Sequence, residues 1–550
     1  MPYQHARFPI LTAESQSDSP TFRTATGCAH SAPFRSILFD DRGSGPEAGS
    51  HELSEFFTDL NLDQIVDAIT VGRDEYNLKP FFYAPVKSID AVHYRQAVFH
   101  DLENPAIFEQ IQLFAEQMRK MRSSMAQSTK LYYKYQKHAL FMIAVEVYCS
   151  AISRLAGGLS SATLESPGFQ SLREYLLGYS KSHDFSLLAA EAGRLRLDLN
   201  SIRYSLHVDG RRVTVGKYSG EPDLSAEVLQ TFEKFRQGAS REYRFAASLW
   251  PEMNHVEAAI IDRIAQIHPE IFSRLDEFPH RHNGYLDPVI AAFDREVQFY
   301  LAYIEFKQRV GRTGRSFCYP TVTSSSREVH GHNIFDLALA NQLVEARRQV
   351  VTNSFFLRGA ERVFVVSGPN QGGKTTFART FGQLHYLGCL GCPVPGSDAR
   401  LFLFDKLFTH FERQESLETL SGKLEDELLR IHRILERATS NSILIMNESF
   451  LSTTLNDALF LSKQIMRRIL SLDMLCVSVT FLDELANVSD AIVSMVSTVD
   501  PSDPAVRTFK IVRKPADGLA YAAAIAQKHH LTQDAVVERI SANAKRANPS

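Results

Sequence analysis

A glycine-rich segment that ends in a lysine and two threonines is the clearest chemical signal in the 550-residue sequence. It reads Ser367-Gly-Pro-Asn-Gln-Gly-Gly-Lys-Thr-Thr and satisfies the pattern G-x-x-x-x-G-K-[ST]. A strand-like apolar run precedes it, and a helix-compatible run from Thr376 to Leu387 follows, as this kind of loop requires. Glycines let backbone N–H groups curve around phosphate oxygens, and the helix N-terminus adds positive potential. The segment therefore predicts a nucleotide phosphate site.

The pattern also assigns roles to two side chains. We expect Lys374 to neutralise charge on the β- and γ-phosphates and the Thr375 hydroxyl to hold Mg²⁺. The whole loop is expected to surround the nucleotide, with contacts from Gly368, Pro369, Asn370, Gln371, Gly372, Gly373, Lys374, Thr375 and Thr376.

A second polar position follows another strand-like run, Ser442-Ile-Leu-Ile-Met. Asn447 is the first polar residue after this run, and Glu448 comes next. A carboxylate on a strand beside the phosphate loop can activate the attacking water as a general base. We expect Glu448 and Lys374 to be the catalytic residues; the alternative for Glu448 is a surface acid at a strand end.

The elements that must position these residues change character along the chain. From Glu52 to about Arg315 apolar residues recur at steps of three and four, which predicts long helices. After Tyr319-Pro320, short apolar runs alternate with turns and helices, as in an α/β domain. The predicted fold class is an α/β P-loop NTPase domain, C-terminal to a mainly α-helical region.

The N-terminal residues are rich in Ser, Pro and Gly and predict a flexible tail. Within it, Ile37-Leu-Phe could dock as a strand or be a stray hydrophobic patch. The predicted parts are a tail (1–50), a helical region (51–320) and an ATPase-type domain (321–550).

One segment of the helical region alternates with period two and predicts a small β-hairpin. Its centre, Asp209-Gly210, suits the positive φ values of a type I′ turn. Folding the segment about this dipeptide pairs Tyr204 with Val215, Leu206 with Val213 and Val208 with Arg211. Arg211 and Arg212 would lie at the tip.

Charge and composition limit the partners. Sixty Lys and Arg face 63 Asp and Glu, a net charge of −3, so a nucleic-acid partner requires a local basic patch. Six scattered cysteines do not form a disulfide framework, which favours a reducing cytosol. The apolar stretch from Ala139 to Leu155 contains charges and predicts a buried helix, and no signal peptide is evident. We expect a cytoplasmic protein without a membrane partner.

Several segments together resemble the MutS family of DNA mismatch-repair ATPases. Pro369-Asn370 within the phosphate loop is more specific to that family than the general pattern. Gly391-Cys-Pro-Val-Pro-Gly resembles its G-x-x-V-P-A stretch, and Asn447-Glu448 with Ser452-Thr-Thr resembles its D-E and Ser-Thr-rich loop. Tyr94-Arg-Gln-Ala-Val-Phe-His-Asp-Leu is similar to the segment that opens the family's core and lever region.

The resemblance implies ATP and Mg²⁺ as ligands, with Thr375 and Asn447 facing the metal. It also implies a homodimer with composite ATP sites, and lever helices that carry a clamp closing on DNA. The hairpin looks like a reduced clamp, and Arg211 and Arg212 are the expected DNA contacts, structure-specific and not sequence-specific.

Three departures from the family pattern predict slow hydrolysis. Asn447 stands where the family has Asp, and Phe481 stands where it has His. The Ser-Thr-Phe of the signature that reaches the partner's nucleotide is missing near Ser421-Gly-Lys-Leu-Glu-Asp-Glu. Losing one preorganised electrostatic contact commonly lowers a rate by about 10²–10³-fold.

The family's mismatch-sensing domain is not expected here, because the lever-like region begins by residue 52. The Phe-x-Glu motif Phe114-Ala-Glu116 lies in a helical pattern, so Phe114 is expected in the core. Sequence therefore predicts a MutS-like, ATP-dependent DNA-binding protein that does not read mismatches directly. The alternatives are an ATPase that remodels a protein partner and a non-hydrolysing ATP-binding scaffold.

Overall fold

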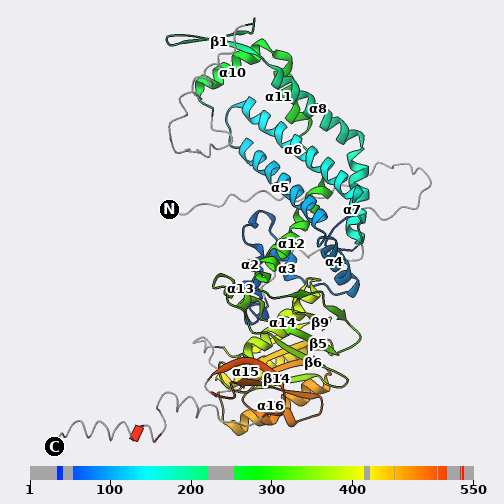
Figure 1. The fold of residues 1–550 in the computed structure, drawn as a ribbon, viewed down its shortest axis with the longest axis vertical. Helices are drawn as coiled ribbons and strands as arrows, with labels where there is room; N and C mark the ends of the chain where they lie inside the picture. Colours follow the sequence, from blue (N-terminus) through cyan, green and yellow to red (C-terminus); the bar gives the residue numbers. More distant parts are fainter. Residues whose placement is uncertain are drawn as a thin grey trace, which may run out of the picture. The chain divides into compact units, whose positions relative to one another are not determined.

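The computed structural model describes residues 34–40, 54–220, 253–413, 422–450, 452–503 and 506–516, together with positions 533, 536 and 537. Within these ranges a helical part precedes an α/β part (Figure 1). Both parts contribute to one hydrophobic core cluster, whose members run from Phe34 to Ile511 in the sequence.

The helical part is built from short helices followed by long ones. Its elements are α1 (Phe56–Asp59), α2 (Leu62–Thr70), η1 (Asp74–Tyr76), α3 (Lys79–Tyr83), α4 (Ile89–Asp101), α5 (Pro105–Ser128), α6 (Lys134–Ser161), α7 (Pro167–Ser180), α8 (His183–Ser201), α10 (His255–Ile267), α11 (Pro269–Arg281) and α12 (Pro288–Gly311). Asn104, Ser166 and Asp287 cap α5, α7 and α12 through their side chains. Each cap is followed by a proline, which has no N–H to leave unpaired in the first turn.

Helix α6 lies inside the helical part, in contact with α5, α7, α8 and α11. By length and hydropathy it would suit a membrane span, but 61% of its apolar window is buried inside the protein. This burial agrees with the buried helix predicted over residues 139–155. Phe114 of α5 is also buried, with its ring against Phe293, as expected for a core residue.

Within the described residues, the α/β part contains three sheets. Its elements are β3 (Phe317–Cys318), β4 (Thr321–Thr323), β5 (Val329–Ile334), α13 (Leu337–Glu345), β6 (Asn353–Leu357), β7 (Val363–Ser367), α14 (Lys374–Cys389), β8 (Val394–Pro395), β9 (Asp398–Phe402), β10 (Leu407–Phe411), α15 (Lys423–Arg437), β11 (Ile443–Asn447), α16 (Leu455–Ser471), β12 (Leu475–Val479), η2 (Asp483–Asn487), β13 (Ile492–Val499) and β14 (Arg507–Arg513). The six-stranded sheet has the order β10-β11-β12-β7-β13-β14, parallel except for β14 at its edge. A four-stranded sheet, β4-β9-β5-β6, and the pair β3-β8 complete the part.

The parallel sheet explains how distant motifs meet. Strands β7, β12 and β11 are neighbours, and all of β7 and β12 is buried, as expected for strands covered on both faces. Parallel strands present their carboxyl ends at one edge, where ligands of such folds bind. The phosphate loop after β7 and the Asn447-Glu448 pair at the end of β11 therefore share this edge.

Residues 34–40 correct the predicted tail. Ile37 and Leu38 are completely buried. Their carbonyl groups accept hydrogen bonds from Tyr300 Oη at 2.8 Å and from Arg95 Nε at 3.0 Å. The segment docks without forming a strand, because side chains and not a neighbouring strand satisfy its backbone. The remainder of the predicted tail, 1–33 and 41–50, lies outside the described residues.

Arg95 joins two of the segments that resemble the MutS family. It is buried in α4, and its guanidinium donates to Leu390 O at 3.1 Å as well as to Leu38 O. A Cβ on Gly391 would lie 2.7 Å from Arg95 Cβ, so this approach requires glycine. Gln96 Nε2 donates to Pro320 O at 3.0 Å. The opening of the helical core is thus fastened to the α/β part.

The predicted hairpin exists, with a shifted register. Strands β1 (Tyr204–Asp209) and β2 (Arg212–Lys217) pair Leu206 with Val215 and Asp209 with Arg212. The predicted pairs, Tyr204 with Val215, Leu206 with Val213 and Val208 with Arg211, are therefore wrong. Gly210 and Arg211 are the central turn residues, and Gly210 alone of the two has positive φ, which fits a type II′ turn.

Candidate functional site

The phosphate loop folds as its glycines predict. Gly368 has φ 113°, and a Cβ there would lie 2.9 Å from the Ser497 carbonyl oxygen on β13. A Cβ on Gly372 would lie 2.2 Å from Ser497 Oγ, which donates to the Gly372 carbonyl at 2.7 Å. The neighbouring strand therefore presses against the loop and fixes its curve ahead of α14.

Lys374 begins α14 and points back into the loop. Its Nζ donates to the carbonyl oxygens of Gly368 at 2.9 Å and Pro369 at 3.1 Å, and the side chain is buried. Burial lowers the pKa of Lys374, and the nearby Glu448 carboxylate acts in the opposite direction. The ammonium also lies 4.6 Å from the centre of the Phe481 ring. A phosphate would replace carbonyl partners that are already in place.

Thr375 and Asn447, the two predicted metal ligands, are in contact with each other. Thr375 Oγ1 donates to Asn447 Oδ1 at 2.8 Å, joining α14 to the end of β11. Both side chains present oxygen, the ligand atom of Mg²⁺, but neither is a carboxylate, so phosphates and waters would supply most of the ion's coordination. The donor chemistry of the pair fits the ion, and its metal role stays a prediction.

Glu448 lines the same pocket as Lys374 and Thr375. It has φ 53°, a left-handed conformation rarely adopted outside glycine, asparagine and aspartate. Its backbone N–H donates to the Val479 carbonyl on β12 at 2.9 Å. The strained turn directs Glu448 away from the path of β11, and Glu448 lines the pocket; its catalytic role stays a prediction.

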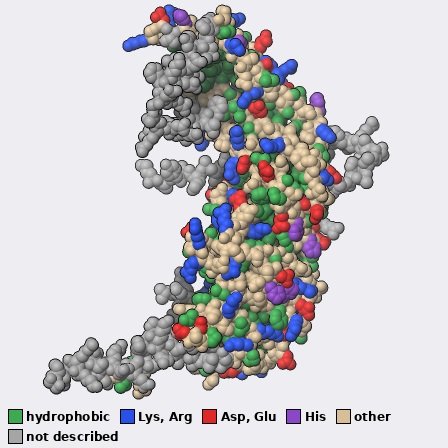
Figure 2. Space-filling view, in the orientation of Figure 1, with side chains coloured by type: hydrophobic (Ala, Val, Ile, Leu, Met, Phe, Trp, Pro, Cys, Tyr) green, Lys and Arg blue, Asp and Glu red, His purple; other side chains and the backbone are tan. Residues whose placement is uncertain are grey.

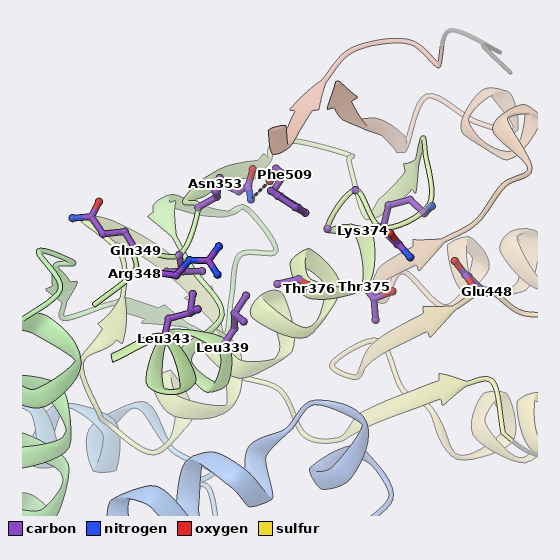
Figure 3. A pocket seen from close by; sticks show the side chains of 15 residues that line it. Leu339, Leu343, Arg348, Gln349, Asn353, Lys374, Thr375, Thr376, Glu448 and Phe509 are labelled. Carbon is purple, nitrogen blue, oxygen red and sulfur yellow. Dashed lines mark hydrogen bonds between the residues drawn. The ribbon is translucent and has the colours of Figure 1, made fainter. Parts of the chain in front are cut away.

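The pocket has a volume of about 510 Å³ and two chemically different ends (Figure 3). Lys374, Thr375 and Glu448 mark the polar end. The other end is lined by Leu339 and Leu343 of α13, the segment 348–351, Asn353 and the Phe509 ring. Ligand pockets of this size combine apolar walls with a few polar groups. The arrangement suits a nucleotide, with phosphates at the loop and the base beside Phe509.

The residues around Phe509, where the nucleobase would lie, were not predicted from the sequence. Phe509 has φ 58°, and its carbonyl oxygen accepts a hydrogen bond from Asn353 Nδ2 at 3.2 Å. Asn353 Oδ1 in turn accepts from the Ile511 N–H at 2.8 Å. These residues come from β6 and the antiparallel edge strand β14, so no contiguous motif marks them. The available signal was a polar pair, Asn353-Ser354, opening a strand that continues with three apolar residues.

Arg211 and Arg212 lie at the exposed turn of the hairpin, outside the pocket. Figure 2 shows positively charged side chains at the free end of this hairpin. Elsewhere on that face, Lys and Arg are interspersed with Asp and Glu. The other basic runs supply structural ion pairs, among them Arg119–Glu75, Arg122–Asp294, Lys134–Asp276 and Lys307–Glu103. The hairpin therefore remains the best candidate for a nucleic-acid contact.

Comparisons with known proteins agree with this geometry. The family model for MutS domain V matches residues 364–546. The DNA mismatch repair protein MutS of Thermosipho melanesiensis is 29% identical over 194 residues, which are 34% of this chain and 23% of that protein. MSH4 of Arabidopsis thaliana is 30% identical over 25% of this chain and 18% of its own length. MSH3 of Eremothecium gossypii is 27% identical over 24% and 13%.

The aligned segments thus span less than a quarter of each of these relatives. The family-model match begins within β7 and includes the phosphate loop and α14, and domain V is the ATPase domain of the family. On these grounds, residues 364–546 of the α/β part are similar to domain V of the MutS family of DNA mismatch-repair proteins.

Proposed function

We propose that the chain binds and slowly hydrolyses ATP, and that ATP controls its closure on DNA or its release. The observation that carries this proposal is the pocket itself. It places residues of the phosphate loop, Thr375 with its hydrogen-bond partner Asn447, and Glu448 at one end, and two leucines, the segment 348–351, Asn353 and the Phe509 ring at the other. The relatives named above are DNA mismatch repair proteins, which supports DNA as the partner.

Each residue at the polar end has a task in this reaction. Mg²⁺, when bound, neutralises charge on the β- and γ-phosphates, and Thr375 and Asn447 would hold it. Lys374 would exchange loop carbonyls for phosphate oxygens. Glu448 would accept a proton from the attacking water. The water oxygen bonds to the γ-phosphorus as the bond between that phosphorus and the ADP oxygen breaks. Lys374 is itself buried, which limits its contact with bulk water.

Slow turnover follows from two side chains at this end. Asn447 provides an oxygen to the metal without the formal charge of an aspartate. Phe481 places an aromatic ring beside Lys374, where the resembled pattern has a histidine that can donate to phosphate. The same two residues favour the second candidate, a non-hydrolysing ATP-binding scaffold.

We also propose a cytoplasmic homodimer with composite ATP sites. The segment in the place of the family signature leads into α15, and none of the α15 residues that the structure describes lines the pocket. A role at the nucleotide of a second copy accounts for that location. We propose that DNA contacts depend on DNA structure and that the protein is not itself the mismatch sensor.

The test of this function is a DNA-binding titration across nucleotide states. Full-length protein is titrated onto duplex, branched and single-stranded DNA, without nucleotide and with ADP, ATP or ATPγS, at several salt concentrations. We expect Kd to change with nucleotide for at least one DNA shape. Equal affinity in all states would contradict ATP gating. ATP hydrolysis without DNA binding would instead support an ATPase that remodels a protein partner.

The hairpin predicts a charge-reversal result. Replacing Arg211 and Arg212 by Glu should weaken DNA binding about tenfold at low salt, because each arginine would neutralise a phosphate. The slope of log K against log salt should fall by about 2 per protomer. The matched control reverses Arg467 and Arg468, an adjacent exposed pair on α16. Equal losses for both pairs would assign the effect to net charge and not to a clamp.

A further inference from the structure

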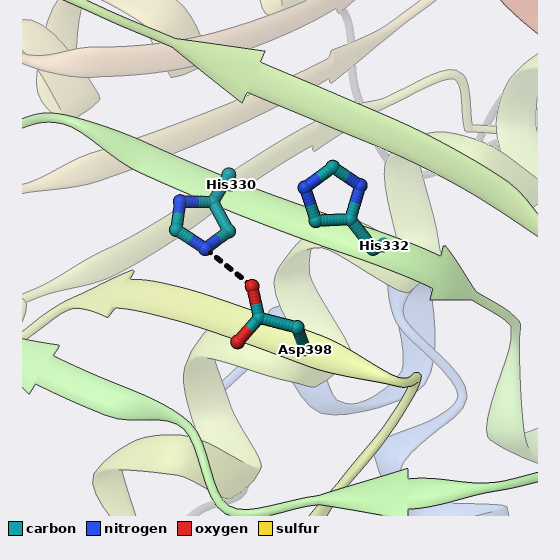
Figure 4. Close-up of side chains that lie close together, drawn as sticks. All are labelled: His330, His332 and Asp398. Carbon is teal, nitrogen blue, oxygen red and sulfur yellow. Dashed lines mark hydrogen bonds and ion pairs between the residues drawn. The ribbon is translucent and has the colours of Figure 1, made fainter.

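Two histidines and an aspartate, none of which lines the pocket, lie together on one face of the four-stranded sheet. His330 and His332 are alternate residues of β5, and Asp398 opens the antiparallel neighbour β9. His332 pairs with Asp398 in the strand register, so the three side chains emerge on the same face. Figure 4 shows both rings beside the carboxylate.

The side chains of this cluster are nearly close enough together to bind one metal ion. His330 Nε2 is 2.8 Å from Asp398 Oδ2, and the two imidazole ring centres are 5.5 Å apart. One ligand atom from each residue lies within 4.8 Å of the others. Tetrahedral zinc, with bonds of about 2.0–2.2 Å, holds its ligand atoms about 3.3–3.5 Å apart. Small side-chain rotations on a fixed sheet supply the difference.

We propose that His330, His332 and Asp398 bind a divalent transition metal ion, with Zn²⁺ as the best match. Imidazole nitrogens favour zinc over magnesium, so this site differs in chemistry from the all-oxygen Thr375–Asn447 pair. His332 and Asp398 are exposed, which leaves a fourth position for water. The ion pair alone accounts for His330 and Asp398 but not for the second ring beside them.

Neighbouring residues affect the expected affinity for the metal ion in two ways: hydrogen bonds hold the strands in place, and a nearby positive charge opposes binding. Asn333 Nδ2 donates to Ser397 Oγ at 3.1 Å, and the Ser397 N–H donates to the His332 carbonyl at 2.9 Å, which fixes the two strand ends. Arg400 pairs with His330 in the register and brings a positive charge to the same face. Metal binding also requires neutral imidazoles, so affinity should fall as the pH is lowered.

Isothermal titration of metal-stripped full-length protein with ZnCl₂, without nucleotide, tests this site. We expect the wild-type protein to bind one equivalent of Zn²⁺. His332→Ala and Asp398→Asn should each bind it at least about tenfold more weakly. The control is His432→Ala, because His432 is an exposed histidine that also pairs with a carboxylate, Glu436. Isotherms of the two site variants that superimpose on wild type would overturn the proposal. ATP binding by each variant verifies that the domain is folded.

A different observation concerns the turn that carries Glu448. Glu448 and Phe450 both have positive φ, at 53° and 63°, and such strain persists only where the surroundings impose it. The Phe450 N–H donates to Glu427 Oε2 on α15 at 3.0 Å. His410 Nδ1 lies 2.9 Å from Ser449 Oγ, and its Nε2 lies 3.3 Å from the Glu427 carbonyl oxygen.

The two side chains that hold this turn, Glu427 and His410, are ionisable groups that are buried. Glu427 is 5% exposed, and burial raises the pKa of its carboxyl group. Burial likewise lowers the pKa of His410 to about 4, so the ring is neutral near pH 7 and can bridge two groups. Removing the buried acceptor would leave the Phe450 N–H unpaired in a strained turn.

We infer that Glu427 is a positioning residue for Glu448, linking the start of α15 to the catalytic turn. This inference rests on the proposed ATPase activity. Glu427 is not among the residues that line the pocket; it acts through the backbone of Phe450. Movement of α15 would then change the position of the Glu448 carboxylate. The part of the pocket beside Phe509, where the nucleobase would bind, would not change.

Steady-state ATPase kinetics of full-length Glu427→Ala and Glu427→Gln test this role. We expect Ala to lower kcat about tenfold with KM and nucleotide Kd within twofold, and Gln, which keeps an acceptor oxygen, to restore most of kcat. Equal kcat in wild type and Ala, or a loss confined to KM, would overturn the inference. Inactive wild-type protein would instead count against the proposed function itself.

Discussion

Replacing Glu448 by Gln is expected to lower kcat for ATP hydrolysis by about 10²-fold or more, the usual range for a lost general base. Nucleotide affinity should remain within twofold, because Lys374, the loop and the residues around Phe509 are unchanged. The amide keeps the size of the carboxylate but cannot accept the proton of water. Single-turnover hydrolysis with excess protein measures the chemical step directly, and fluorescent-nucleotide binding measures affinity.

The control for this experiment is Glu436→Gln. Glu436 is an exposed α15 carboxylate paired with His432, so its replacement removes the same charge from the same domain. It should leave hydrolysis unchanged. Equal single-turnover rates in wild type and Glu448→Gln would remove Glu448 from catalysis and support the scaffold alternative.

The phosphate site was predictable because its residues are contiguous and chemically distinctive. The glycines, Lys374 and Thr375 occupy one loop, and Asn447-Glu448 directly follows a buried strand. Neighbouring parallel strands then bring the two motifs to one edge. The motifs identified the residues of the site, and the order of the strands explains why those residues lie close together.

The base end could not be predicted in the same way. Leu339, Asn353 and Phe509 come from a helix, a mixed sheet and an antiparallel edge strand, and only tertiary packing unites them. The buried contacts of Ile37 and Leu38 with Tyr300 and Arg95 are equally non-local.

The hairpin register shows a subtler limit. Asp209-Gly210 was expected to occupy both central turn positions, but Asp209 ends β1 and pairs with Arg212. Moving the turn by one residue changes every pairing partner by two residues. The strand faces are therefore preserved, and Leu206 still lies on the face that contains Val215.

Restoring the aspartate of the family pattern, by Asn447→Asp, is expected to raise the hydrolysis rate at limiting Mg²⁺ by up to about 10²-fold. The replacement adds a charge beside the metal, and carboxylate oxygen is a better Mg²⁺ ligand than amide oxygen. It keeps the acceptor for Thr375 Oγ1, and hydrogen bonds to an ionised group are stronger. An ATPase titration against Mg²⁺ should show half-saturation at a lower concentration.

Asn441→Asp is the matched control, because Asn441 is an exposed residue just before β11 and accepts a hydrogen bond from Arg327. It adds the same charge to the same domain without facing the pocket. A similar Mg²⁺ response in both variants would indicate a general electrostatic effect, and no response in Asn447→Asp would remove Asn447 from the metal site. A lower half-saturating Mg²⁺ concentration without a faster rate would locate the remaining barrier at Phe481, whose ring faces Lys374 and cannot donate to phosphate.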